Sequence, residues 1–297
     1  MDLIESRLDD IDAYVAYFSA RPLPVLKHTV RELEQLRSEE DSVSARRLAG
    51  VVLGDPLMAM RVITFLEERR RQSQNHDITT IDRAIMMMGV SPFFQAFSDL
   101  PLVEDQLARH PRALLGLLKV INRARRAAHF ARDWAIVRHD LDVEEITLGA
   151  LLREAAEILC WSFAPDLALD VQAAQRDDRS LRSSVAQEAV FGCSAEDIQQ
   201  RLIHTWRLPE LLLNLIDASH ADNPRVRNIA LAGALARHSE RGWDDPALPD
   251  DLDAICRLLH IGIESLLKRL GVPQEHATRY LPDPDGPESA ATPTGIP

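Results

Sequence analysis

Apolar residues recur at intervals of three or four along most of this chain, and that spacing is the feature that most restricts its fold. Leu26, Val30, Leu33 and Leu36 form one such stripe. Residues at these intervals share one face of an α-helix, which can then be buried against a neighbouring helix. No segment alternates apolar and polar residues for long enough to form a sheet, so we predict an all-α fold, a bundle of many helices.

Helix start and stop signals divide this pattern into separate elements. Asp55-Pro56 is typical of a helix start, because the aspartate accepts hydrogen bonds from free backbone N–H groups and proline suits the first turn. Ser42 or Ser44, Thr79 or Thr80, and Ser91-Pro92 are further predicted starts, and Ser194 with Asp197 has capping-box spacing. Predicted stops are at Gly54, Gly89 and Gly271.

The helical pattern suggests four regions: an N-terminal helix over 1–19, a main domain over 20–240, a helical extension over 241–272, and a tail over 273–297. The main domain contains enough helices for two subdomains, divided near residue 105. The tail is rich in Pro, Ser, Thr and Ala, and we predict that it is disordered, because it has little apolar surface to bury. Longer helices are predicted at 106–136, 142–163, 225–239 and 251–270.

The charge of the chain argues against a general role in binding nucleic acid. Acidic residues outnumber basic ones by 46 to 34, which gives a formal net charge of −12 over 297 residues. An acidic surface repels phosphate backbones, so such binding would need a local basic patch. Two arginine clusters exist, Arg69–Arg71 and Arg123 with Arg125 and Arg126, and both are interpreted as solvated helix faces.

Cysteine use and hydropathy predict a cytoplasmic protein without a membrane span. Cys160, Cys193 and Cys256 are an odd number at wide spacing, which is not typical of a disulfide framework or a zinc site. Cys160 and Cys256 have apolar neighbours and are predicted to be buried. The first ten residues are acidic and have no apolar export core, and no apolar run approaches membrane-spanning length.

Several fragments, in order, resemble the HDOD domain, an output-domain relative of the HD phosphohydrolases. They are Leu23-Pro24, the block 48–63 around Asp55-Pro56, the block 78–90 ending in Met88-Gly89, and the corner Trp206-Arg207-Leu208-Pro209. The resemblance covers roughly 20–240 and implies structural roles for Asp55, Pro56, Gly89, Trp206, Leu208 and Pro209.

The resemblance also implies where the metal ligands of an HD phosphohydrolase would lie, and this chain has other residues there. Arg153 and Glu154 replace the His-Asp pair that follows Gly149–Leu152. Ala195 stands at a later histidine position, Gly233 at a final aspartate position, and Ile121 or Asn122 near an upstream histidine. Arginine has only hydrogen-bond donors and stays protonated, so it cannot bind a metal cation. We therefore predict a degenerate site without metal or cofactor, in which His220 is the best candidate for a vestigial polar residue.

Several residues near this site have more than one interpretation. Arg153 and Glu154 are predicted to form ion pairs with neighbouring helices, and the alternative for Arg153 is that it binds an anion or phosphate. Glu154 and Glu157 have the spacing of paired carboxylates but are not predicted to perform acid–base chemistry. Met86–Met88 are predicted to fill the core, with a flexible partner-binding face as the alternative.

The prediction for function is a non-catalytic bacterial regulatory module that binds signalling or regulatory proteins. Three alternatives remain open. The first is a sensor that holds a nucleotide or another anion at Arg153. The second is a divergent metal-dependent phosphohydrolase that uses residues such as His129, His139 or His220. The third, a nucleic-acid binder, depends only on the two arginine clusters. Self-association is possible under any of these interpretations.

Overall fold

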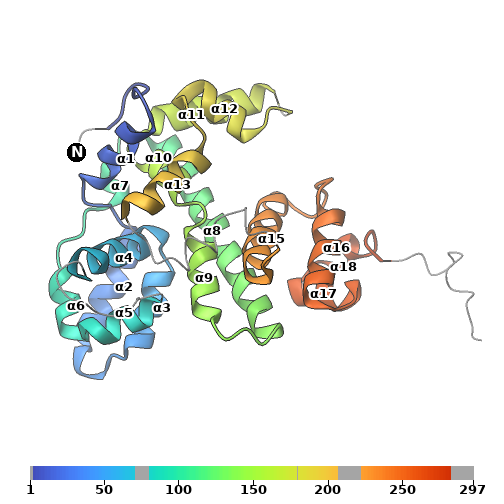
Figure 1. Cartoon of the computed structure of the whole chain (residues 1–297), viewed down its shortest axis with the longest axis horizontal. Coiled ribbons are helices and arrows are strands. Elements are labelled where there is room, and N and C mark those ends of the chain that lie inside the picture. The colour runs from blue at the N-terminus through green and yellow to red at the C-terminus, as the bar shows by residue number, and fades with distance from the viewer. Residues whose placement is uncertain (1–2, 71–79, 179, 207–221, 282–297) are drawn as a thin grey trace, which may run out of the picture.

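The computed structural model describes residues 3–70, 80–178, 180–206 and 222–281 and shows an all-helical protein (Figure 1). No strand occurs in these ranges. The nearest approach is an isolated parallel bridge between Val25 and Leu102. The predicted fold class, a helical bundle without a sheet, is therefore confirmed.

The helices form three groups in space (Figure 1). One group comprises the helices between residues 27 and 96, a second lies around the N-terminal helix, and a third is built on the long helix α8 and continues to the C-terminal helices. The first group contains α2 (Lys27–Ser38), the 3-10 turn η1 (Glu40–Ser42), α3 (Ala45–Leu53), α4 (Pro56–Arg70), α5 (Ile81–Met88) and α6 (Val90–Ala96). The second contains α1 (Ile11–Ser19), α7 (Val103–Gln106), α10 (Ala155–Phe163), α11 (Pro165–Asp177), α12 (Ser183–Phe191) and α13 (Ala195–Trp206). The third contains α8 (Pro111–Val137), α9 (Val143–Leu152), α15 (Pro224–His238), α16 (Leu248–Leu259), α17 (Ile263–Leu270) and α18 (Gln274–Ala277).

At most of the predicted helix starts, the predicted side chain caps the helix. The side chains of Ser44 and Thr80 accept hydrogen bonds from the backbone N–H groups of the first turns of α3 and α5. Ser194 and Asp197 form the predicted reciprocal box, in which each side chain accepts from the backbone N–H of the other. The prediction at Ser91-Pro92 was wrong by a residue or two, because α6 already begins at Val90, directly after Gly89.

Asp55 both caps α4 and joins it to α2. Its carboxylate is fully buried and accepts from the backbone N–H of Leu57 at 2.9 Å, as a helix cap does. It also accepts from the backbone N–H of Leu26 at 2.9 Å and from the hydroxyl of Thr29 at 2.8 Å. Burial raises the pKa of Asp55, while these hydrogen bonds oppose that rise. The predicted cap is thus also a tertiary contact.

The N-terminal helix is packed into the protein rather than appended to it. Predicted to span the first twenty residues, it comprises only Ile11–Ser19. Tyr14 and Phe18 are fully buried, and Phe18 packs against Phe163 of α10 with the ring centroids 5.6 Å apart. Helix α1 also packs along α13. These contacts join the first residues to the core of the second group.

The C-terminal part is ordered further along the chain than the prediction of a tail from residue 273 allows. Gln274–Ala277 forms α18, and the hydroxyl of Tyr280 donates to the backbone oxygen of Trp243 at 2.5 Å. The single helix predicted over 251–270 is two helices, because His260 adopts the left-handed conformation, with φ of 54°, and ends α16. In the described part of the chain, no helix combines the length and apolar character needed to cross a bilayer.

Helix α8 contacts α10 at Gly116, where there is no room for a side chain. A Cβ atom at Gly116 would lie 2.5 Å from the Trp161 ring, inside any normal contact distance. Both residues are buried, so the indole has little freedom to move away. Gly116 therefore sets how closely the two helices approach.

The prediction that Met86–Met88 fill the core was wrong for two of the three residues. Met86 is 69% and Met87 53% exposed, whereas Met88 packs against the core. The reason is geometric: α5 is amphipathic and buries Ile81, Ala84 and Ile85 against the rest of the first group, which turns positions 86 and 87 outward.

Candidate functional site

The candidate site is the joint between α9 and α10, where the predicted continuous helix over 142–163 is broken. α9 ends at Leu152, Arg153 and Glu154 form a turn, and α10 begins at Ala155. The buried side chain of Gln199 on α13 spans the break. It donates to the backbone oxygen of Leu152 at 3.0 Å and accepts from the backbone N–H of Ala156 at 2.8 Å. Sequence reasoning did not identify Gln199, since only the fold brings it to this turn.

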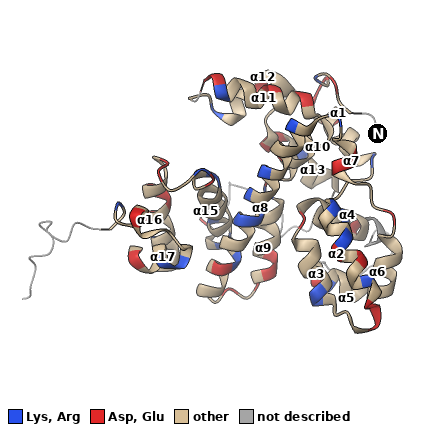
Figure 2. Ribbon diagram, turned by 180° about the vertical axis from the view of Figure 1, so that it is seen from behind, with Lys and Arg blue, Asp and Glu red and all other residues tan. Residues whose placement is uncertain are grey.

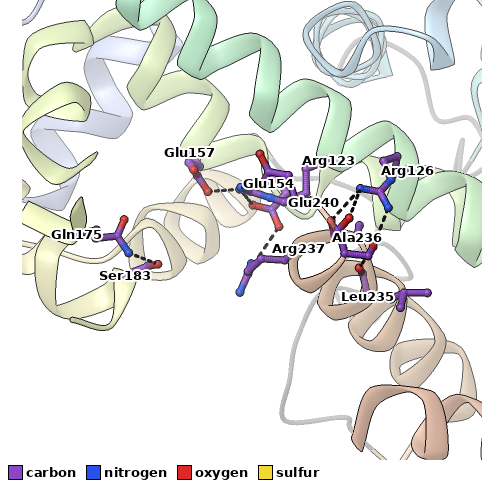
Figure 3. A network of polar contacts seen from close by, with 11 residues as sticks. Arg123, Arg126, Glu154, Glu157, Gln175, Ser183, Leu235, Ala236, Arg237 and Glu240 are labelled. Atoms are coloured by element: carbon purple, nitrogen blue, oxygen red, sulfur yellow. Dashed lines mark hydrogen bonds and ion pairs between the residues drawn. The ribbon is translucent and has the colours of Figure 1, made fainter. Parts of the chain in front are cut away.

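Glu154 lies at the centre of a network of ion pairs that connects three helices (Figure 3). Its carboxylate accepts from Arg123 of α8 at 2.7 Å and from Arg237 of α15 at 3.3 Å. Arg123 also pairs with Glu157 of α10 at 2.6 Å, and Glu240 lies 4.0 Å from it. The side chains of Arg123 and Glu154 are only 11% and 7% exposed. The prediction that Glu154 forms ion pairs with adjacent helices is confirmed.

The electrostatic environment favours the charged form of Glu154. Burial would raise the pKa of Glu154, but the guanidinium groups of Arg123 and Arg237 outweigh that effect and hold the pKa below its usual value. Burial and the charge of Glu154 together raise the pKa of Glu157, although Arg123 opposes the rise. Burial disfavours the charged form of Arg123, yet its two carboxylate partners raise its pKa overall. Glu154 is therefore the charged acceptor that both arginines share.

Arg153 is next to this network but does not join it. Within the described ranges it forms no hydrogen bond or ion pair, contrary to the prediction of a structural pair. Its side chain passes Gly233 of α15, where a Cβ would lie 3.5 Å from its Cδ and 3.6 Å from its Nε. Burial lowers the pKa of Arg153, the charge of Glu154 raises it, and Arg237 lowers it again. The result is a half-buried guanidinium with no hydrogen-bond partner among the described residues.

The prediction that Arg123, Arg125 and Arg126 form a solvated face was wrong. Arg123 is held by carboxylates, and Arg125 donates through Nε to the backbone oxygen of Gly54. Arg126 donates to the hydroxyl of Ser239 at 2.7 Å and to the backbone oxygen of Ala236 at 3.4 Å (Figure 3). Each arginine joins α8 to another element. Because α8 is packed between other helices, its arginines lie next to carboxylates, backbone oxygens and a hydroxyl of those elements. The other cluster, Arg69–Arg71, lies outside the described side chains.

Most of the chain, including the α9–α10 joint, matches a known protein family. The family model described as "HDOD domain" matches residues 23–222. The chain belongs to the HDOD family. The match includes the α9–α10 joint and leaves α1 and the helices from α15 onward outside it.

Solved structures agree with this assignment at the level of the fold. A virulence factor from Campylobacter jejuni subsp. jejuni has a TM-score of 0.66 at 19% identity and is similar over 91% of this chain and 99% of that chain. The MmoQ response regulator from Methylococcus capsulatus has a TM-score of 0.57 at 19% identity, covering 88% and 98%. No curated protein matches the chain.

The residues that carry the HDOD resemblance have structural roles in the described part of the chain. Besides Asp55, Pro56 begins α4 and Gly89 separates α5 from α6 with a φ of 85°. The indole N–H of Trp206 donates to the hydroxyl of Ser19 at 2.9 Å and so ties α13 to α1. Leu208, Pro209 and His220 lie outside the described residues.

The side chains at the HD positions do not form a set of donors for a divalent cation. Glu154 is neutralised by two guanidinium groups, Arg153 offers no lone pair, and Gly233 has no side chain. Ala195 begins α13, where its backbone N–H donates to Gln187 at 2.9 Å, and near the upstream position Ile121 is buried while Asn122 is exposed. Across the described residues, no three His, Cys, Asp or Glu side chains are grouped to hold a metal.

Two glycines at comparable places in helices should respond to alanine in opposite ways. Gly233→Ala is expected to stabilise the protein by about 0.5–1 kcal/mol, because alanine favours the helix and its Cβ would make ordinary contacts with Arg153. Gly116→Ala is expected to destabilise it by about 1–3 kcal/mol, because Trp161 must move. Urea unfolding of both variants measures this, and a stabilised Gly116→Ala variant would contradict the packing described.

Proposed function

We propose that this HDOD protein is a non-catalytic regulatory module that works in the bacterial cytoplasm by binding other proteins. The observation that carries the proposal is how the chain uses the place where the HDOD resemblance implies a lost metal site. Arg123, Glu154 and Arg237 there tie α8, the α9–α10 joint and α15 together, so the residues serve the fold rather than a reaction. The three free cysteines suit a reducing compartment.

Two further observations support a regulatory and protein-binding role. One protein of similar fold is itself named a response regulator. Helix α5 also presents Met86 and Met87 to solvent, and methionine is frequent at binding surfaces because its unbranched side chain adapts to different partners. We take the exposed end of α5 as the contact surface for a partner protein.

The absence of catalysis is tested on protein that has met neither a chelator nor a metal-affinity column. Elemental mass spectrometry is expected to find no stoichiometric manganese, iron, zinc or nickel. A panel of phosphoesters with added Mn²⁺ or Mg²⁺ is expected to stay intact. A bound metal at one equivalent, or turnover that Glu154→Gln abolishes, would replace this proposal with a metal-dependent phosphohydrolase.

The contact surface is tested by crosslinking in lysate followed by mass spectrometry of the captured proteins. A double variant, Met86→Gln with Met87→Gln, should lose a partner that the unaltered protein captures. The matched control is Leu141→Gln, which removes a similarly exposed apolar side chain from the α8–α9 turn. Equal capture by both variants would exclude α5 as the contact surface.

The guanidinium of Arg153, which has no hydrogen-bond partner in the described part of the chain, favours a second candidate function, a site that holds an anion without cleaving it. A half-buried arginine without an acceptor can gain charge-assisted hydrogen bonds from a phosphate group. Isothermal titration with inorganic phosphate tests this site. Binding that Arg153→Gln abolishes supports the candidate, whereas the absence of binding excludes it.

A further inference from the structure

An open groove of about 430 Å³ lies between α8 and the C-terminal helices, and none of its lining residues belongs to the α9–α10 joint. Its volume falls within the range of about 300–1,000 Å³ that is usual for small-molecule sites. We call it the α8–α17 groove. It is lined by the middle of α8, the segment after α15 and the end of α17, through Arg125, Arg126, His129, Phe130, Trp243 and Arg269.

The charge of the groove is opposite to that of the whole chain. Three arginines and one aspartate, Asp133, line it, although the protein carries a net charge of −12. Asp133 is already paired with Arg269 at 2.6 Å. Arg125 donates only through Nε, so its two terminal nitrogens have no hydrogen bond to a described residue. Figure 2 shows basic residues grouped along α8, and a local positive surplus of this kind attracts anions.

The groove also contains flat apolar surfaces held in fixed positions. The Phe130 ring stacks on the buried Trp134, with 10° between the ring planes, and the guanidinium of Arg126 lies 5.7 Å from its centroid. The backbone oxygen of Trp243 accepts from Tyr280, which ties the tryptophan to the C-terminal segment. Aromatic faces and guanidinium groups together suit a ligand that is both planar and anionic.

We propose that the α8–α17 groove binds a nucleoside monophosphate. The base would lie against Phe130 and Trp243, and the phosphate would accept hydrogen bonds from Arg125 and Arg269. The volume fits one nucleotide, and the net charge of −12 on the whole chain disfavours a long polyanion. This site uses none of the residues of the α9–α10 joint, so it stands independently of the proposed function.

Isothermal titration of the full chain with AMP, GMP, adenosine and inorganic phosphate tests the groove. AMP or GMP is expected to bind one-to-one with a Kd below about 1 mM, and adenosine and phosphate alone should bind much more weakly. Arg269→Gln and Trp243→Leu should each weaken binding by about tenfold, since each removes one of the two kinds of contact. Arg257→Gln on α16 is the matched control, an exposed arginine paired with Asp253 outside the groove, and should leave binding unchanged.

Four results would overturn the proposal. The first is no binding of AMP or GMP at millimolar concentration. The second is equal weakening by Arg257→Gln. The third is inorganic phosphate binding as tightly as the nucleotides, which would remove any role for the rings. The fourth is a single-stranded oligonucleotide that binds more tightly than either nucleotide, which would make the groove a nucleic-acid surface. Arg153→Gln separates the two sites, since it should leave nucleotide binding intact, and melting curves show whether each variant is folded.

Discussion

Replacing Arg123 with methionine is expected to destabilise the protein by about 3–5 kcal/mol, the usual cost of removing one partner from a buried ion pair. The methionine would keep most of the packing of the arginine stem but would leave Glu154 with only the exposed Arg237 and Glu157 with no basic partner in the network. Urea unfolding followed by circular dichroism measures the loss, which should appear as a lower midpoint with little change in slope.

The matched control is Arg237→Met, which removes the other arginine that pairs with Glu154. The side chain of Arg237 is 55% exposed, so water screens its pair, and the loss should stay within about 1 kcal/mol. A triple variant that changes Arg123, Glu154 and Glu157 to methionine should recover much of the stability lost in Arg123→Met, because no uncompensated charge remains. A loss below about 1 kcal/mol in Arg123→Met would show that the network is not desolvated as described.

Asp55→Ala is expected to destabilise the protein by about 3–5 kcal/mol. It removes the acceptor for three buried donors, the N–H groups of Leu26 and Leu57 and the hydroxyl of Thr29, and each unsatisfied donor costs about 1–3 kcal/mol before relaxation. It also removes the cap of α4. Chemical denaturation measures the change in the free energy of unfolding.

Ser44→Ala separates the capping effect from the tertiary one. Ser44 caps α3 at the surface by accepting from the backbone N–H of Arg47 at 3.2 Å, so its loss should cost only about 0.5–2 kcal/mol. Asp55→Asn should fall between the two variants, because an amide presents one acceptor where the carboxylate presents two. If Asp55→Ala lowered the free energy of unfolding no more than Ser44→Ala does, the link between α2 and α4 would not contribute to stability.

The sequence predicted the parts of this fold that depend on neighbouring residues. Apolar spacing and the caps at Ser44, Asp55, Thr80 and Ser194 correctly predicted helices and many of their starts, because a cap and the N–H group it binds lie within three residues of each other. The HDOD resemblance correctly placed the chain in its family over most of its length. The positions where the resemblance implies lost metal ligands come from the same short blocks and stay a prediction.

The errors arose where a long-range contact overrides a local preference. Residues 142–163 contain no proline, and 151–156 around the break are all good helix formers, so nothing local predicts a break at Arg153 and Glu154. Gln199, more than forty positions away, satisfies the backbone groups that the break exposes. Met86 and Met87 are apolar like core residues, yet both are exposed. Packing against the neighbouring helices decides which side of α5 is buried.

What the sequence by itself determined about this protein is therefore its helical class, its caps and its family. Only the tertiary structure decided which charges meet. Arg123 and Glu154 are 31 residues apart, and Glu154 and Arg237 are 83 apart, so no helical period relates them. The same packing left Arg153 without an ion pair to any described residue and brought Arg125, Phe130, Trp243 and Arg269 around one groove. The physical reason is that hydrogen bonding and apolar periodicity within a helix act over a few residues, whereas pairing between helices depends on the position of every element at once.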